Sequence, residues 1–80
     1  MDSIQDYDLV VLLEDRAATH KTTHQPILLR RGQVGTVLMS FEGVAFLVDF
    51  TDSQGNTFAM ESIEADRLLR LIYEPMAIAA

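Results

Sequence analysis

The chain has 80 residues, of which 49% are apolar, and twelve acidic against six basic side chains give it a net charge of −6. It is too apolar for a disordered segment, and the absence of cysteine excludes disulfides, thiolate metal sites and cysteine nucleophiles. No apolar run reaches the roughly 18–20 residues that span a bilayer, and the first residues are acidic, so we expect a cytoplasmic protein without a membrane segment.

Five short segments have the composition of β-strands, because they are rich in β-branched and aromatic residues and are bounded by charged or turn-forming residues. They are residues 9–13, 34–41, 44–50, 57–61 and 69–73. The sequence Thr51–Thr57 between the third and fourth segments contains almost every turn-forming residue type. Four glycines are expected to shape the turns, namely Gly32, Gly35, Gly43 and Gly55.

The segment before the last strand has a helical signal. Ser62 is a candidate N-cap for one turn over residues 63–66, which carries two acids near its positive end. The alternative is a helix over residues 63–73 packed on a four-stranded sheet, since apolar residues recur there near helical spacing. Pro75 ends either element. Residues 74–80 form an apolar tail after a core of about residues 7–73.

Five strands, one long first connection and a helical turn predict a mainly β fold, a small five-stranded SH3-like barrel, as a single domain over residues 1–80. The long connection is residues 14–31, and connections of this length are usually functional, mobile or both. Alternation along the strands predicts the inward-facing residues. They are Val10, Leu12, Val37, Met39, Phe46, Val48, Phe50, Phe58, Met60 and Leu71.

The first and third strands are apolar on both faces, which is typical of strands covered on both sides. The surplus residues are Leu9, Val11 and Leu13 on the first strand and Ala45 and Leu47 on the third. At about 25 cal/mol per Å² of apolar surface, leaving such side chains in water reduces the stability of the fold by several kcal/mol. We therefore expect the surplus face to be covered by the long connection through Ile27–Leu29, by the tail with Met76 and Ile78, or by another copy.

Charge is segregated along the chain. Residues 16–31 carry Arg16, Lys21, Arg30 and Arg31 and no acid, whereas residues 32–66 carry six acids and no base. These four cations are a possible anion contact, although we favour the interpretation that they neutralise acidic neighbours in the same chain. Binding along nucleic acid requires several phosphate contacts, and an acidic body repels that polyanion.

No catalytic constellation is visible in the sequence. His20 and His24 have a spacing that places both rings on one face of a helix, but their neighbours do not favour a helix, so we expect loop histidines and no metal. The carboxylates are scattered, and the serines lie outside any nucleophile-elbow sequence. We expect no enzymatic activity, no cofactor and no small-molecule substrate. Asp8, which enters the first strand, is expected to accept hydrogen bonds from a neighbouring turn.

Four segments carry a resemblance to a known family: Asp8–Leu12, Arg31–Val37, Phe46–Phe50 and Gly55–Thr57. They resemble small bacterial SH3-like proteins that are catalogued only as a domain of unknown function. The G-x-x-G-x-V pattern of residues 32–37 is also similar to the turn of KOW domains and to the barrel of the nitrile hydratase β-subunit. The resemblance covers about residues 7–72 and implies a fold, with no activity attached to it.

We therefore interpret the chain as a non-enzymatic protein-interaction module that self-associates or docks on a larger protein. Its contact residues would be the surplus apolar residues named above, together with Met76 and Ile78 of the tail. A KOW-like RNA-binding module, using the four cations, is one alternative. An acidic inhibitor of a partner protein, of the antitoxin or immunity type, is the other.

Overall fold

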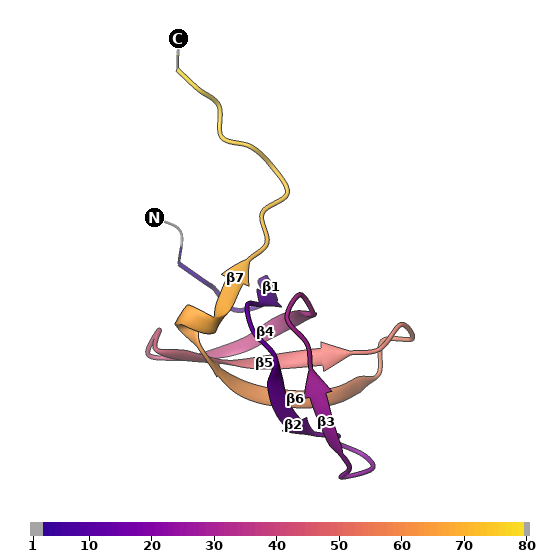
Figure 1. Ribbon diagram of the computed structural model, residues 1–80. Helices are drawn as coiled ribbons and strands as arrows, with labels where there is room; N and C mark the ends of the chain where they lie inside the picture. Colours follow the sequence, from indigo (N-terminus) through magenta and orange to yellow (C-terminus); the bar gives the residue numbers. More distant parts are fainter. Residues whose placement is uncertain (1–2, 80) are drawn as a thin grey trace.

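The computed structural model describes residues 3–79 (Figure 1), and its regular elements are seven β-strands and one 3-10 turn. The mainly β fold is therefore confirmed. In chain order, the elements are β1 (Leu9–Leu12), β2 (Arg16–Thr19), β3 (Pro26–Leu29), β4 (Val34–Phe41), β5 (Ala45–Thr51), β6 (Thr57–Glu64), the 3-10 turn η1 (Ala65–Arg67) and β7 (Leu68–Arg70). No helix in residues 3–79 has the length and apolar character needed to cross a membrane.

Five strands form one antiparallel sheet in the order β6-β5-β4-β1-β7. Hairpin turns join β4 to β5 and β5 to β6, so these three strands follow one another in space as in sequence. β1 pairs with both β4 and β7, which brings the two ends of the domain together at one side of the sheet. Within residues 3–79, the ladders do not close into a barrel.

The connection predicted over residues 14–31 is instead a second sheet, because β2 and β3 pair as an antiparallel hairpin. Pro26 is tolerated in this hairpin since it is the first residue of its strand, where it pairs with Thr19. Leu29 is fully buried, and Ile27 and Ala18 pack against the same core. The hairpin thus covers the inner face of the five-stranded sheet.

The core lies between this hairpin and the inner face. Its buried members are Val10, Leu12, Leu29, Val37, Phe46, Val48, Phe50, Ala59, Ile63 and Leu68. Six of the residues predicted to face inward are among them, but the other four are not fully buried. Those four are Met39, Phe58, Met60 and Leu71.

Two β-bulges explain why Met39 and Met60 do not face inward, whereas Phe58 is partly buried and packs against the core as predicted. In β4 the register shifts between Val37 and Met39, and in the β5–β6 pair it shifts beside Phe58. A bulge adds one residue to a strand, so the side chains beyond it point to the opposite face. Met39 therefore lies opposite Leu47 on the outer surface, while Ala59 takes the inward place next to the bulged Phe58 and leaves Met60 exposed.

The segment before the last strand also differs from the prediction. Strand β6 runs through Ser62 to Glu64, so Ser62 caps no helix, and the helical turn is the 3-10 turn one to two residues later. The alternative helix over residues 63–73 is wrong, because Leu68–Arg70 pair with β1 as β7. Leu68 lies opposite Leu12 and is buried in place of Leu71.

Gly35 lies inside β4 rather than in a turn. A Cβ at this position would lie 2.5 Å from Cγ1 of Val48 and 3.0 Å from Cε1 of Phe50. The glycine therefore lets β4 approach the core side chains of β5 closely. Gly32, Gly43 and Gly55, by contrast, have positive φ angles in the turns where they were expected.

Candidate functional site

The face of the five-stranded sheet that is turned away from the core is the candidate site, and we call it the outer face. Strand register defines its members, because residues directly opposite each other point to the same side. They are Leu9, Val11, Val34, Thr36, Met39, Phe41, Ala45, Leu47, Asp49, Met60, Ser62, Glu64 and Leu69. Nine of these thirteen are apolar, which is unusual for a sheet face open to water.

The apolar members form continuous rows across the strands. Leu69, Val11 and Val34 lie side by side on β7, β1 and β4. Further along β4, Met39 lies opposite Leu47 of β5. Leu69 and Val34 remain 54% and 49% exposed, so this surface is open and not a second core.

The structure gathers four of the predicted contact residues on this one face. Leu9, Val11, Ala45 and Leu47 are all half-buried members of it. Leu13 lies just beyond β1 and is exposed; its N–H donates to the carbonyl oxygen of Arg67 at 3.0 Å. The two remaining predicted residues, Met76 and Ile78, lie on the tail and are highly exposed.

Five apolar members of the outer face were missed by the sequence prediction: Val34, Met39, Phe41, Met60 and Leu69. Met39 and Met60 were assigned to the core because the bulges are invisible in simple alternation. Leu69 belongs to the face because β7 pairs with β1, and this strand order has no local sequence signal. The apolar excess on the first and third predicted strands was the signal that pointed to this side of the sheet.

Within the described residues, neither the hairpin nor the tail covers the outer face. Ile27 and Leu29 pack on the core from the inner side, so the expectation that they roof the surplus residues is wrong. In Figure 1 the tail leaves β7 and extends away from both sheets. Apolar surface of this extent on a small protein typically marks an interaction site.

Asp49 is the one acid in the middle of this face. It lies between Thr36 of β4 and Met60 of β6 in the sheet register. Its Oδ1 atom is buried and has no hydrogen-bond partner within residues 3–79. A buried acceptor without a partner costs stability, by about 1–3 kcal/mol. Among the described residues, none therefore compensates the burial of this oxygen with a hydrogen bond.

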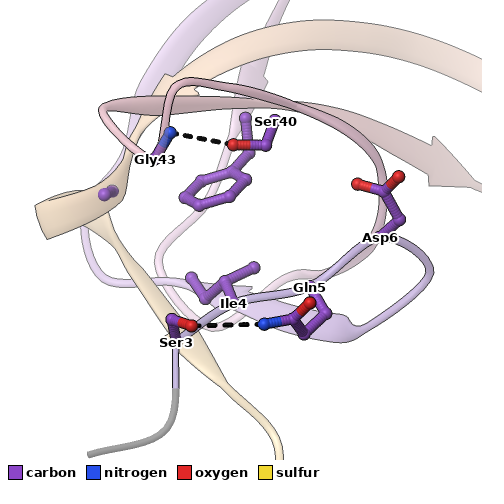
Figure 2. A pocket seen from close by; sticks show the side chains of 8 residues that line it. Ser3, Ile4, Gln5, Asp6, Ser40 and Gly43 are labelled. Atoms are coloured by element: carbon purple, nitrogen blue, oxygen red, sulfur yellow. Dashed lines mark hydrogen bonds between the residues drawn. The ribbon is translucent and has the colours of Figure 1, made fainter.

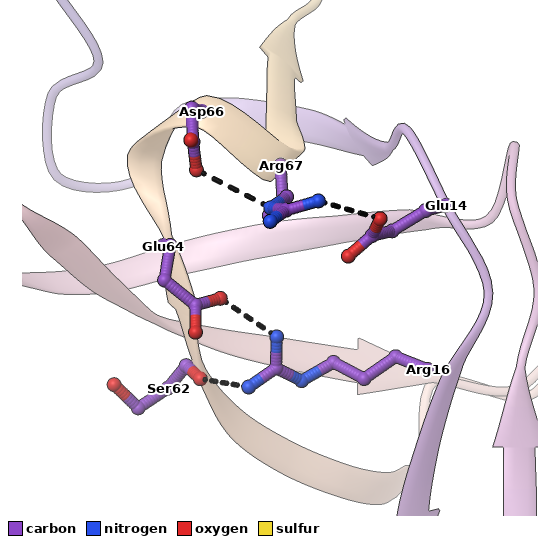
Figure 3. A network of polar contacts seen from close by, with 6 residues as sticks. All are labelled: Glu14, Arg16, Ser62, Glu64, Asp66 and Arg67. Atoms are coloured by element: carbon purple, nitrogen blue, oxygen red, sulfur yellow. Dashed lines mark hydrogen bonds and ion pairs between the residues drawn. The ribbon is translucent and has the colours of Figure 1, made fainter.

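Arg16 fastens the β2–β3 hairpin to the edge of the five-stranded sheet (Figure 3). Its Nη1 donates to Oε2 of Glu64 at 2.8 Å, and its Nη2 donates to the carbonyl oxygen of Ser62 at 3.0 Å. The backbone N–H of Lys21 also donates to the carbonyl oxygen of Phe58 at 2.7 Å. The guanidinium of Arg16 is thus engaged in holding β2 beside β6.

The hydrogen bonds at Glu64 lower the pKa of its carboxyl below the ordinary value of 4.5. The largest cause is the bond from its own backbone N–H, and the bond from Arg16 is the second. Both favour the charged form.

Arg67 forms a second set of surface ion pairs (Figure 3). Its Nη1 lies 2.7 Å from Oε2 of Glu14, and its Nε lies 3.4 Å from Oδ1 of Asp66.

The four cations of the possible anion contact do not form one cluster. Arg30 and Arg31 lie in the turn before β4, where the backbone N–H of Arg31 donates to Oδ1 of Asp15 at 2.8 Å. Lys21 lies at the other end of the hairpin, in the β2–β3 turn. Arg16 is paired with Glu64, as described above.

The acid at the start of β1 has the role that the sequence predicted. Oδ2 of Asp8 accepts a hydrogen bond from the backbone N–H of Gln5 at 2.8 Å. The same oxygen lies 3.0 Å from Nε of Arg70, and the pair is partly buried. Asp8 therefore ties the N-terminal segment to β7.

His20 and His24 lie in the β2–β3 turn and have different environments. Nδ1 of His20 accepts the backbone N–H groups of Thr22 and Thr23 at 3.1 and 3.2 Å. Its ring stacks on Phe58 at a centroid distance of 6.3 Å. His24 is exposed and adopts a positive φ of 61°. His20 thus organises the turn through its side chain.

A hollow of about 670 Å³ opens between the N-terminal segment and the β4–β5 turn (Figure 2). Ile4 lies within the hollow. Polar side chains at the rim of the hollow form hydrogen bonds with other residues of the rim. The Oγ of Ser3 accepts from Nε2 of Gln5 at 3.2 Å, and the Oγ of Ser40 accepts from the backbone N–H of Gly43 at 2.9 Å. These bonds hold local structure, and they do not converge on a common point.

Two antiparallel sheets around one core, with one sheet face left apolar and open, define a small β domain. A family model described as a domain of unknown function, DUF4926, matches residues 6–70, and the chain belongs to this family. The match contains all seven strands and the whole outer face, and it ends at residue 70, the last residue of β7. No curated protein and no solved structure matches the chain.

Proposed function

We propose that this protein is a non-enzymatic protein-interaction module that associates with itself through the outer face of its five-stranded sheet. The observation that carries the proposal is the uncovered apolar surface on that face. The hairpin, which is the one element placed to cover a sheet face, lies on the other side. A cytoplasmic setting fits a chain without cysteine.

The amount of apolar surface supports this function. Val34, Met39, Phe41, Met60 and Leu69 each retain more than a third of their exposure. Roughly half of the surface of these five side chains is exposed. If a partner covers it, the gain in free energy at about 25 cal/mol per Å² is several kcal/mol. That gain is comparable to the free energy that holds a small domain folded. Burial of this face therefore contributes a favourable term to association, which must exceed the entropy lost when two chains combine.

For the fold, we propose that the two sheets together correspond to an SH3-like barrel. Its support is the position of the hairpin, which packs on the inner face while β2 lies against β6. Two contacts join these strands: the bond from Lys21 N to Phe58 O, and the side-chain bonds of Arg16 to Ser62 and Glu64. A comparison with an experimentally determined member of the DUF4926 family tests this assignment.

The proposed function is tested by two lysine substitutions at side chains of similar exposure. Met39 on the outer face is 46% exposed, and Leu28 on the hairpin is 57% exposed. The wild-type chain is expected to dimerise in sedimentation equilibrium. Met39→Lys should raise the dissociation constant by at least about tenfold, whereas Leu28→Lys should leave it unchanged. A wild-type chain that stays monomeric at high micromolar concentration, or equal effects of both substitutions, would overturn the proposal.

An acidic inhibitor of a basic protein is a second candidate, and the ion pairs favour it. Arg16, Arg67 and Arg70 each contact a carboxylate of the same chain, so the net negative charge dominates the field at the surface. The response to salt separates the two candidates. Association between two chains of charge −6 strengthens as salt screens their repulsion, whereas binding to a basic partner weakens.

A further inference from the structure

The C-terminal tail, residues 71–79 of the described chain, is an apolar segment whose first residues line a shallow hollow beside Tyr7–Leu9 and whose later residues are highly exposed. After β7, the N–H of Leu71 donates to the carbonyl oxygen of Leu9, and the chain then extends away from the body (Figure 1). Four large apolar side chains follow, at Ile72, Tyr73, Met76 and Ile78. Met76 and Ile78 are 91% and 95% exposed.

The tail also lies outside the part of the chain that the family model matches, which ends at residue 70. The matched unit thus contains the outer face, and the tail follows it. An extended segment with alternating large side chains is the kind of ligand that a sheet face or groove binds.

We propose that residues 72–78 of one copy bind the outer face of a second copy, and that the second copy returns the same contact. The inference rests on the proposed function, because it uses the outer face as the receptor surface. The inference adds that the bound segment is the tail, and that each copy binds the tail of the other.

Charge favours this pairing of surfaces. Two subunits of charge −6 repel each other, so a stable contact must avoid bringing acidic surfaces together. The described residues after Glu74 carry no charged side chain, and Asp49 is the one acid within the central rows of the outer face. Oδ1 of Asp49 is already buried in the single subunit, so a docked tail removes no further water from that atom.

The available area matches the requirement of a stable dimer. The four large tail side chains, which are 65–95% exposed, present on the order of 500 Å², if each contributes roughly 100–200 Å². The half-exposed apolar residues of the outer face add on the order of 300 Å². Each copy would then bury about 800 Å², which is the contribution per partner in an interface of standard size.

The direction in which the tail leaves its own sheet favours a second copy over its own subunit. β7 is an edge strand, and the tail continues outward from it instead of turning back across β1 and β4. The chain bends at Glu74 before Pro75 and then continues as an extended segment. The seven residues 72–78 span up to about 25 Å when extended, which is enough to reach a neighbour.

The test compares two double substitutions in the full chain that add the same charge to the same segment. Met76→Lys with Ile78→Lys removes the proposed anchors, and Ala77→Lys with Ala79→Lys leaves them in place. By sedimentation equilibrium, the first variant is expected to raise the dissociation constant at least about tenfold more than the second. Deletion of residues 72–80 should abolish dimerisation while preserving the far-UV circular dichroism spectrum of the β domain.

A mixing experiment distinguishes tail exchange from packing of face against face. The tail-deleted chain retains the receptor face, and Met39→Lys retains the tail, so the two variants should bind each other more tightly than either binds itself. A tail-deleted chain that dimerises like the wild type, or no gain on mixing, would overturn tail exchange. If Met39→Lys still disrupts such a dimer, the proposed function stands without this inference. A monomeric wild-type chain, including one whose tail folds over its own sheet, would overturn both.

Discussion

Met39 of β4 lies directly opposite Leu47 of β5 on the outer face, although strict alternation from Val37 would place Met39 in the core. The bulge between Val37 and Met39 causes this exchange of faces. It leaves the core with a smaller set of side chains from β4 and gives the outer face a large, flexible one. Methionine suits a surface that must adapt to a partner, because its side chain is unbranched and polarisable.

We expect truncation of Met39 on the outer face and truncation of Val48 in the core to lower the free energy of unfolding by different amounts. Met39→Ala should lower the free energy of unfolding by less than about 1 kcal/mol, because the side chain is nearly half exposed. Val48→Ala removes two methyl groups from a fully buried position and should cost about 2 kcal/mol or more. Urea unfolding measures both values, at a protein concentration low enough to keep the chain monomeric. Equal costs would mean that Met39 packs in the core.

The strands themselves could be predicted from local sequence, because their apolar runs end at turn-forming residues. The run around Phe46–Phe50 and the polar turn after it are the clearest case, and Val34–Phe41 has the bounds that the sequence predicted. The hairpin over residues 16–29 could not be predicted in this way. Its strands are short, and Pro26 argues against a strand unless it is known to be the first residue of one.

The candidate site was predictable only in part, for a related reason. The surplus of Leu9, Val11, Ala45 and Leu47 showed that one sheet face would be apolar on both central strands. Which residues complete that face depends on strand order and on bulges, and both follow from tertiary pairing. Val34 and Leu69 join Val11 in a row only because β4 and β7 flank β1.

The close approach of β4 to β5 at Gly35 predicts that a side chain at this position would clash with β5. In Gly35→Ala, the new Cβ would lie 2.5 Å from Cγ1 of Val48 and 3.1 Å from the carbonyl oxygen of Asp49. Because Val48 is buried and β-branched, it cannot move away cheaply, and we expect a loss of about 1–3 kcal/mol in unfolding free energy.

The control for Gly35→Ala is the same substitution in a Val48→Ala background. Removing Cγ1 relieves the shortest contact, so Gly35→Ala should cost less there than in the wild type. The difference between the two costs, obtained from urea unfolding of the four proteins, is the coupling energy. Strictly additive costs would show that Val48 is not the obstacle.

Glu64 predicts a dependence of stability on pH. Its pKa is lowered in the folded chain, chiefly by the bond from its own backbone N–H and then by Arg16, so its charged form favours folding. This contribution is complete above the ordinary pKa of 4.5 and disappears as pH falls through the lower folded value. The stability of the wild type relative to Glu64→Gln should therefore be greatest near neutral pH and decline below pH 4.5.

The matched control is Glu74→Gln, which removes the same charge from the exposed tail. It changes the net charge as Glu64→Gln does, but it leaves the contact with Arg16 intact. Urea unfolding across pH 3–7 should show a smaller pH-dependent difference for this control. A Glu64→Gln profile that runs parallel to the wild-type profile would contradict a depressed pKa at Glu64.

The burial of Oδ1 of Asp49 predicts that a conservative substitution at this position stabilises the monomer. This oxygen is buried without a hydrogen-bond partner in residues 3–79, and an uncompensated carboxylate oxygen costs more to bury than an amide. Asp49→Asn keeps the shape and removes the charge, so it should raise the free energy of unfolding by about 1 kcal/mol.

The same substitution separates the two candidate functions, because they place different chemistry over the outer face. An apolar tail from a second copy gains from a neutral residue at position 49, so Asp49→Asn should leave self-association unchanged or strengthen it. A basic partner would lose an attractive charge and bind more weakly. Urea unfolding of the monomer together with sedimentation equilibrium measures both effects. A less stable Asp49→Asn monomer would mean that the carboxylate supports the fold, and weaker self-association would contradict an apolar occupant.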